Sequence, residues 1–323
     1  MSAINQTEEV MRKGKPLPSW SVVIPVKNGG QRLKQLLASI KSQEDIGRPD
    51  QIIAVDSGST DDSVSTLKEC GAMVLSIPPE DFRHGAARNL GASQVTSDII
   101  IFNNQDAVPD NPHSYKKLIQ DLMERKECAG TCATLIPHHD CDPLTERDVL
   151  SEFGLVKKGR YVKESEEKRL EKLRNFHTVC CAVRRDVFDK IPFREVMFGE
   201  DYLWRRDAGE AGYTTCVSPA RVRHSHNIFP HPSRLLSINA DTTYFRREFE
   251  KHTIMEYIHW LVVGIFLDLL YLHEKKNLTV WQKMGWMILS PYVRSLQFWG
   301  RVMGKYRDRL PGWLVRKIFY YYR

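Results

Sequence analysis

Three polar segments of the sequence carry side chains that could perform metal or acid–base chemistry. Asp106 comes shortly after the apolar run DIIIFN, where a carboxylate can bind a divalent cation or simply cap a turn. His224 and His226 flank one residue, so on an extended chain both imidazoles face the same side, where they could bind a metal ion or a phosphate or be purely structural. Glu200 and Asp201 open a predicted helix, whose N-terminus favours ionised carboxylates. Such a carboxylate can serve as a general base, or it can only cap the helix.

Three further residues offer groups suited to a nucleotide or a phosphate. Asp56 ends the apolar run QIIAVD and could accept a hydrogen bond from a pyrimidine N3–H, or cap the next helix. His84 and Arg88 lie on a short predicted helix and offer a donor and a cation of the kind that bind phosphate. Each of these signals is weak by itself, and their order along the chain is what makes them specific.

These residues lie within an alternation of predicted strands and helices. The predicted strands are residues 21–26, 51–56, 72–77 and 98–103, and the predicted helices contain residues 33–40, 64–67 and 85–92. Each strand is a continuous apolar run, which indicates a mostly parallel sheet covered by helices on both faces. Because ligands bind at the carboxyl ends of such strands, we expect Lys27, Asp56 and residues 104–106 at one edge of the sheet.

The alternation is interrupted once before it resumes. Residues 137–176 are polar and rich in charge, which predicts an insertion or lid with a solvated helix. A strand over 177–184, a helix beginning at residue 200 and a last strand over 214–224 follow.

The order of these motifs resembles the family 2 glycosyltransferases of the GT-A fold. The motifs are VVIPVKN, VDSGSTDDS, FRHGAARNLGA, NNQDAVP, GED and HSH, and they are most similar to the bacterial rhamnosyltransferase branch. The resemblance implies an α/β fold with a mostly parallel sheet flanked by helices over residues 21–230. Outside the resemblance, the composition predicts a polar extension over residues 1–20 and a helical region that associates with membranes over residues 231–323.

The resemblance also implies a role for each candidate residue. Asp201 would be the general base, and Asp106 would bind Mg²⁺ or Mn²⁺ on the donor diphosphate together with His224 or His226. Asp56 would contact the nucleobase. The residues expected to bind the donor are Pro25, Lys27, Asp56, His84, Arg88, Asn104, Gln105 and Glu200.

Two positions depart from the pattern of the family. Asn104 replaces the first Asp of the Asp-x-Asp motif, which leaves the metal with one fewer anionic ligand. Lys27 replaces an aromatic residue that often stacks on the base. The implied reaction is a single displacement with inversion at the anomeric carbon, moving L-rhamnose from dTDP-rhamnose onto a lipid-diphosphate-linked glycan during synthesis of a bacterial surface polysaccharide. The choice of rhamnose comes only from the resemblance in FRHGAARN, NNQDA and HSH.

The last third of the chain has a different composition. The apolar run 257–272 has 16 residues, which as a helix spans about 24 Å and is short of a hydrocarbon core of about 30 Å. The whole net charge of +7 falls within residues 294–323, which hold eight basic residues and one acid. Basic residues interleaved with Trp and Tyr favour helices lying in a membrane interface, whereas a helical domain or a dimer contact is the alternative.

Several other classes of protein fit the sequence less well. A sugar nucleotidyltransferase would leave GED and HSH without a role, and a non-catalytic scaffold would keep the fold without using the site. The aromatic-rich tail accompanies no nucleic-acid-binding motif. The polar N-terminus lacks an apolar signal region and the seven cysteines form no disulfide pattern, so we expect a cytoplasmic protein at the inner face of the cell membrane.

Overall fold

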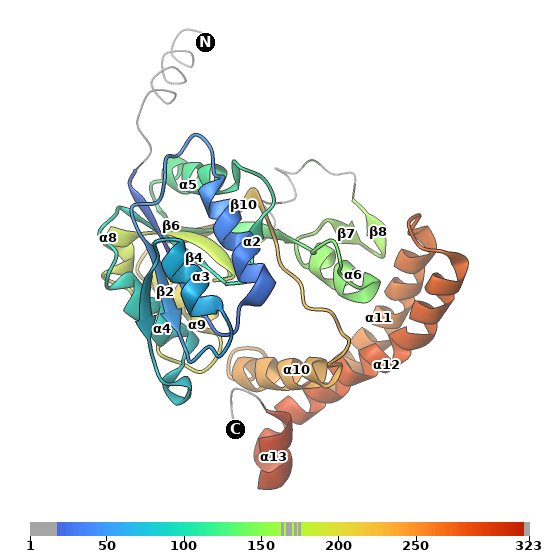
Figure 1. Ribbon diagram of the computed structural model, residues 1–323. Helices are drawn as coiled ribbons and strands as arrows, with labels where there is room; N and C mark the ends of the chain where they lie inside the picture. Colours follow the sequence, from blue (N-terminus) through green and yellow to red (C-terminus); the bar gives the residue numbers. More distant parts are fainter. Residues whose placement is uncertain (1–17, 163–164, 166–169, 171–172, 174–175, 320–323) are drawn as a thin grey trace, which may run out of the picture.

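A single eight-stranded sheet forms the centre of the computed structural model, which describes residues 18–162, 165, 170, 173 and 176–319 (Figure 1). The strand order is β3-β2-β1-β4-β9-β6-β10-β5. The strands are β1 Trp20–Val26, β2 Ile52–Asp56, β3 Met73–Ser76, β4 Ile99–Asn103, β5 Val108–Pro109, β6 Cys128–Ile136, β9 Cys180–Arg184 and β10 Thr214–Arg223. All the predicted strands are present, and most of the predicted extension 1–20 lies outside the described residues.

Six of the eight strands run in the same direction. β1 is parallel to β2 and β4, β2 to β3, and β6 to β10. β9 is antiparallel to both β4 and β6, and β5 is antiparallel to β10. The predicted mostly parallel sheet is therefore confirmed. The carboxyl ends of β1, β2, β4, β6 and β10 meet at one edge, as the sequence predicts.

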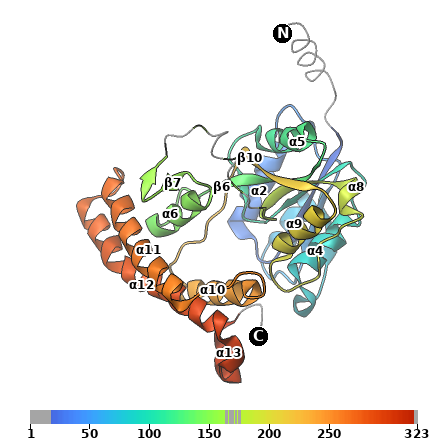
Figure 2. The ribbon, with the colours of Figure 1, turned by 180° about the vertical axis from the view of Figure 1, so that it is seen from behind.

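Helices cover both faces of this sheet. α2 and α3 lie in front of it in Figure 1, and α4 and α9 lie in front in Figure 2. The helices of this part are α2 Gly30–Lys41, α3 Ser63–Glu69, α4 His84–Ala92, α5 Ser114–Glu124, α8 Arg185–Phe188 and α9 Glu200–Glu210, with a 3₁₀ turn at Pro79–Asp81. The apolar spacing that predicts the first helix is the buried face of α2, formed by Leu33, Leu36, Leu37 and Ile40.

The segment predicted as a solvated lid contains a helix that is partly buried. α6 spans Pro143–Glu152 and is followed by the short hairpin of β7 Val156–Lys157 and β8 Arg160–Tyr161. The Asp142 carboxylate accepts hydrogen bonds from the backbone N–H groups of Leu144 and Thr145, and so caps the helix. α6 contacts both β6 and the C-terminal helices, so this part of the segment is a bridge and the prediction of a solvated helix is wrong for it. The charged run after residue 162 lies mostly outside the described residues.

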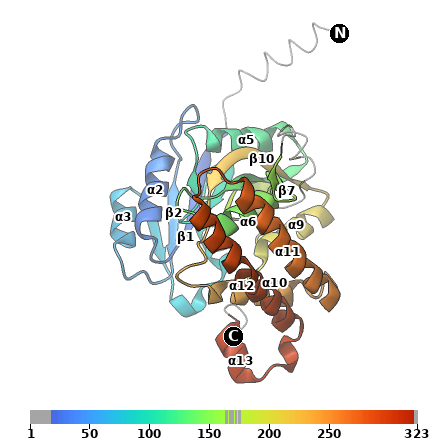
Figure 3. The ribbon, with the colours of Figure 1, turned by 90° about the vertical axis from the view of Figure 1, so that its right-hand side faces the viewer.

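Four helices make up the C-terminal region. They are α10 Ser233–Arg246, α11 Ile254–Glu274, α12 Val280–Lys305 and α13 Gly312–Ile318, with a 3₁₀ turn at Arg307–Arg309. α11 and α12 run side by side in front of α6 (Figure 3). α10 packs closely on α12 at Gly300 and Gly304, where an added Cβ would lie 2.5 Å from the Leu236 carbonyl oxygen and 2.4 Å from that of Ala240.

The helix α11 is longer than the apolar run from which it was predicted. A capping box between Thr253 and Glu256 starts it before residue 257, so that it has 21 residues and spans about 31 Å. The expectation of a helix too short to cross a membrane is therefore wrong. Within the described residues, α11 is the one helix whose length and composition would allow a crossing.

Candidate active site

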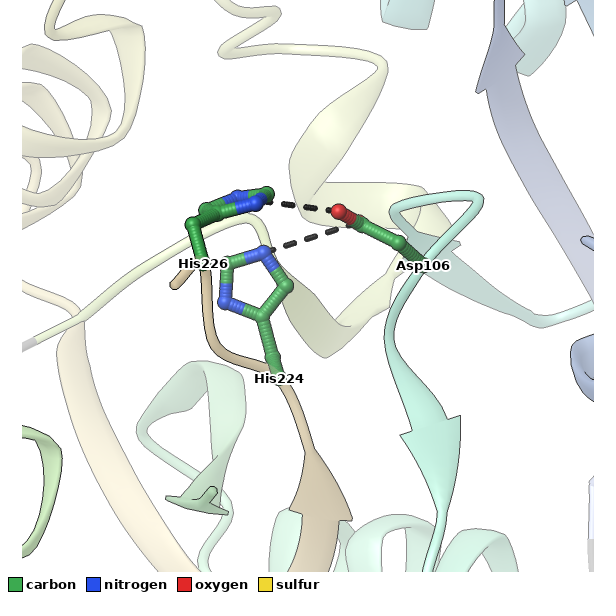
Figure 4. A group of neighbouring side chains, drawn as sticks. All are labelled: Asp106, His224 and His226. Carbon is green, nitrogen blue, oxygen red and sulfur yellow. Dashed lines mark ion pairs between the residues drawn. The ribbon is translucent and has the colours of Figure 1, made fainter. Parts of the chain in front are cut away.

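Asp106, His224 and His226 converge at the carboxyl edge of the sheet (Figure 4). Asp106 lies in the loop between β4 and β5, and the two histidines directly follow β10. Asp106 Oδ1 is 3.5 Å from His224 Nε2, and its Oδ2 is 3.6 Å from His226 Nε2. One ligand atom from each residue lies within 4.8 Å of the other two. Two segments more than 100 residues apart thus offer three ligand atoms to one point.

The charges of this cluster suit a cation. Burial raises the pKa of Asp106, but the hydrogen bond from His224 and the electrostatic interaction with both imidazole rings outweigh it, so the pKa lies well below its usual range. Burial and the neighbouring His224 lower the pKa of His226 to about 4. Asp106 is therefore ionised and His226 neutral at pH 7, and these are the protonation states in which both bind metals.

The donor set decides which metal ions fit. One carboxylate and two imidazoles make a mixed oxygen and nitrogen set, whereas Mg²⁺ prefers oxygen ligands and several waters. The three residues therefore offer a mixed donor set that could hold a divalent metal ion. This chemistry also offsets the absence of a carboxylate at Asn104, since the two imidazoles supply ligand atoms that the Asp-x-Asp motif does not.

The guanidinium of Arg88 joins the metal-side loop to the helix that carries Asp201. Arg88 is only 2% exposed, and it donates hydrogen bonds to Glu200 Oε1 at 2.9 Å and to Asn104 Oδ1 at 2.7 Å. It also donates to the carbonyl of His84 at 3.2 Å. The Thr178 hydroxyl donates a second hydrogen bond to Glu200 Oε1 at 3.0 Å. We call Arg88, Glu200, Asn104 and Thr178 the buried frame.

The buried frame changes the interpretation of three residues expected to bind the donor. Arg88 and Glu200 are buried and engaged with each other, so they hold the site together from behind. The Asn104 side-chain oxygen faces Arg88 through a hydrogen bond. Beside them, burial lowers the pKa of His84 to about 4, so this side chain offers a neutral imidazole. Direct donor contact by these residues stays a prediction.

Asp201 is the second residue of α9, next to Glu200, as predicted. A helix N-terminus alone would favour the ionised carboxylate, whereas the pKa of Asp201 is raised. Burial and the charge of Glu200 raise the pKa of Asp201 to about 7, and the hydrogen bond from the Tyr202 N–H opposes them only partly. A carboxylate with a pKa near the working pH is well matched to general-base catalysis. Gly199, the residue before α9, has φ +81° and packs closely on the Phe245 ring. A Cβ added to Gly199 would lie 2.3 Å from Phe245 Cε1.

The side of the site expected to face the nucleobase is held by hydrogen bonds to backbone groups. The Asp56 carboxylate at the end of β2 accepts from the N–H groups of Gly58 and Ser59 and so shapes the loop after β2; it does not cap α3, whose N-cap is Asp62. Gln105 reaches across to β1, where its amide accepts from the Lys27 N–H at 2.9 Å and donates to the Lys27 carbonyl at 3.0 Å. Pro25 is buried within β1, and the Lys27 side chain is exposed.

Two residues of the site were missed from sequence. His138 Nε2 lies 3.0 Å from the Asp106 carbonyl oxygen, and the Ser225 hydroxyl accepts from the His138 N–H, so His138 ties both halves of the metal cluster together. The run HHD at residues 138–140 was assigned to the lid. It directly follows the apolar run of β6, and a polar residue after an apolar strand is the feature that identified Asp106. Thr178 could not be identified in this way, because it comes before β9 and not after it.

Comparison with known proteins identifies the family. Residues 21–192 match the model of Glycosyl transferase family 2. The chain belongs to this family. It is 31% identical over 222 residues to the O-antigen chain rhamnosyltransferase WbaN of Salmonella anatum, with 66% of this chain and 68% of the relative covered. It is 32% identical over 220 residues to the O-antigen chain rhamnosyltransferase RfbN of Salmonella typhimurium, covering 65% and 67%. This family 2 glycosyltransferase is therefore close to the rhamnosyltransferase branch, as the motifs predict.

Solved structures confirm the GT-A fold. The mannosyltransferase PcManGT from Pyrobaculum calidifontis, solved with GDP-Man and Mn²⁺, superimposes with a TM-score of 0.58 at 12% identity and covers 94% of both chains. Glucosyl-3-phosphoglycerate synthase from Mycobacterium tuberculosis, solved with Mn²⁺ and UDP, has a TM-score of 0.51 at 20% identity and covers 73% of this chain and 78% of its own. The protein is a glycosyltransferase, and a divalent metal is consistent with such a fold.

Proposed function

We propose that this glycosyltransferase uses Mn²⁺ to move L-rhamnose from dTDP-rhamnose, with inversion, onto a lipid-diphosphate-linked glycan. The observation that carries the proposal is the pairing of the Asp106, His224 and His226 cluster with Asp201, whose pKa is about 7. A metal-binding group and a base are what a single displacement at a sugar needs.

In the proposed mechanism Asp201 accepts the proton of the acceptor hydroxyl. The bond from that oxygen to the anomeric carbon forms while the bond from the anomeric carbon to the phosphate oxygen breaks. Asp106, His224 and His226 would hold the cation, which supplies Lewis-acid neutralisation of the charge on the leaving nucleoside diphosphate. The pKa of Asp201, raised by burial, lets this carboxylate accept a proton near neutral pH.

The buried frame supports this mechanism by fixing the separation between the loop that carries Asp106 and the helix that carries Asp201. Arg88 binds Asn104, two residues before Asp106, and Glu200, the neighbour of Asp201. The metal loop and the base helix are thus held by one buried guanidinium. Correct spacing of two reacting groups contributes several powers of ten to the rate of such reactions.

The proposed donor and acceptor are supported by the relatives. Both relatives are named O-antigen chain rhamnosyltransferases, and O-antigen chains are surface polysaccharides. The donor-binding residues proposed lie at the strand ends, with the exposed Lys27 and the buried Asp56 on the nucleobase side.

A membrane surface is the partner proposed for the C-terminal helices. α11 exposes Met255, Val262 and Phe266, and α12 exposes Trp281 and Ile288, which are 79% and 75% accessible. Basic side chains follow on α12 and beyond, where they would face anionic headgroups. We propose peripheral association with the cytoplasmic face of the cell membrane.

The test measures release of nucleoside diphosphate from dTDP-rhamnose, UDP-glucose, UDP-galactose and GDP-mannose, with Mn²⁺, Mg²⁺ or chelator. We expect Mn²⁺-dependent release from dTDP-rhamnose and its loss in Asp201→Asn. Asp50→Asn, an exposed position at the opposite edge of the sheet, is the matched control and should keep full activity. Release from a different donor would refute rhamnose, and an active Asp201→Asn would refute the base.

A further inference from the structure

A cavity of about 390 Å³ lies between α6, α11 and α12, away from the metal cluster. It is lined by side chains from all three helices, and so by both the bridge and the C-terminal hairpin. The lining residues are Arg147, Asp148, Ser151, Glu152, Trp260, Gly264, Arg294, Gln297 and Arg301.

Two of the three arginines in this cavity form ion pairs with carboxylates. Arg294 donates to Asp268 from Nε at 2.7 Å and from Nη2 at 2.6 Å, and from Nη1 to Asp148 at 2.6 Å. Arg147 is 2.7 Å from Asp148 and 2.9 Å from Asp268. Two guanidinium groups thus meet two carboxylates, and this balanced set joins α6 to the hairpin.

Arg301 is the cation left over. Its guanidinium lies over the Trp260 ring, 5.3 Å from the centroid, and within the described part of the chain it has neither a hydrogen bond nor a carboxylate within 4 Å. It is half-buried, so water compensates its charge only in part. A positive charge held on an aromatic ring in a cavity is a suitable partner for an anion that enters from outside.

The helix α6, which lines the cavity, also reaches the reaction site. Asp142 at its start accepts a hydrogen bond from the backbone N–H of Ile228, two residues after His226. On the other side, α11 carries Trp260 toward the cavity and exposes Val262 and Phe266. The sugar of a lipid-linked acceptor must reach the general base Asp201, and its lipid chain must reach the apolar face of α11. The phosphates that join them must therefore lie between Asp201 and that face.

We propose that this cavity binds the phosphates of the lipid-diphosphate-linked acceptor, with Arg301 as the pairing cation and Trp260 as the wall that holds it. This inference extends the proposed function by naming where the acceptor is recognised, and it rests on that function. Arg301 presents two parallel N–H groups to a phosphate, a geometry that a lysine cannot reproduce.

The experiment compares two acceptors that carry the same glycan, one on a short-chain prenyl diphosphate and one on a neutral alkyl chain. We expect the wild-type kcat/KM to be at least about 10-fold higher for the diphosphate, the factor that one charge-assisted hydrogen bond supports. Arg301→Gln should remove most of this preference, and Arg301→Lys should keep part of it. Lys190→Gln, which removes one exposed positive charge from the catalytic domain, is the matched control and should keep the whole preference. Inorganic pyrophosphate serves as a competitor that separates recognition of free phosphate from that of the lipid-linked group.

Each outcome decides the question. Equal use of both acceptors by the wild type, or an unchanged preference in a folded Arg301→Gln, overturns the inference while the transferase function stands. Thermal melting of each variant checks the fold, and Arg301→Lys keeps the test valid should Arg301→Gln unfold. Competition by pyrophosphate alone, without preference for the prenyl diphosphate, reassigns the cavity to free phosphate. Absence of rhamnosyl transfer to either acceptor, with donor binding retained, refutes the proposed function itself.

Discussion

Replacing Arg88 by methionine is expected to destabilise the fold strongly, because it removes the charge at the centre of the buried frame. The methionine fills much of the same space but leaves the Glu200 carboxylate 5% exposed, with the Thr178 hydroxyl as its remaining side-chain donor. Breaking a buried ion pair by removing one partner costs about 3–5 kcal/mol. The Asn104 oxygen loses its partner as well, so we expect the upper half of this range.

The free energy of unfolding would be measured by urea titration followed by circular dichroism. Glu200→Gln alone should also destabilise, because it leaves Arg88 buried without its counter-charge. The double variant should be less destabilised than the sum of the two by about 1–3 kcal/mol, since no buried charge is then left unpaired. Arg83→Met is the matched control. Arg83 lies on the same segment as Arg88 and donates to the nearby carbonyls of Glu80 and Phe82, so its replacement should cost under about 1 kcal/mol.

One result would refute this reasoning. If Arg88→Met unfolds like the wild type and instead raises the KM for the donor, Arg88 contacts the donor and does not hold the frame. The same conclusion would follow if the double variant were as unstable as the sum of the single ones.

Three further predictions concern the metal, the base and the membrane. Asp201 is protonated below its pKa of about 7 and ionised above it, so kcat/KM should rise as the pH increases through about 7; a pH profile that is flat from 5 to 8 would contradict this. Asp106→Asn should weaken Mn²⁺ binding at least 10-fold, measured by electron paramagnetic resonance of free Mn²⁺, because the cluster loses its one carboxylate. Trp281→Glu should reduce co-sedimentation with anionic vesicles several-fold, whereas the same change at the exposed Lys190 on the catalytic domain should not.

The edge of the sheet that carries Asp106, His224 and His226 was predictable from sequence, because strands that run in parallel bring their carboxyl ends to one edge. Their close approach depends on the antiparallel pairing of β5 with β10, which the sequence did not predict. The identity of the strands followed from their apolar runs. The direction of β9 could not be predicted, because a fully buried strand is apolar throughout whether it runs parallel or antiparallel.

Residues whose role depends on burial could not be assigned. Arg88 on an amphipathic helix is equally compatible with a phosphate contact and with a buried ion pair, and only the position of Glu200 across 112 residues decides between them. The pKa of Asp201 was misjudged for the same reason. The helix N-terminus is visible in the sequence, but the burial that outweighs it is not. Likewise α11 was underestimated because its start is set by the Thr253 capping box and not by hydrophobicity.

The amide of Gln105 pairs with both the N–H and the carbonyl of Lys27, as a neighbouring strand would. The loop after β1 and the loop after β4 therefore form one mechanical unit that carries the nucleobase side and Asp106 together. A change in backbone path that made room for a different base would also shift Asp106 against His224 and His226. With the roles proposed for Lys27 and Asp106, donor preference would be changed by exchanging side chains such as Lys27, whereas remodelling either loop would alter the nucleobase side and the Asp106, His224 and His226 cluster at the same time.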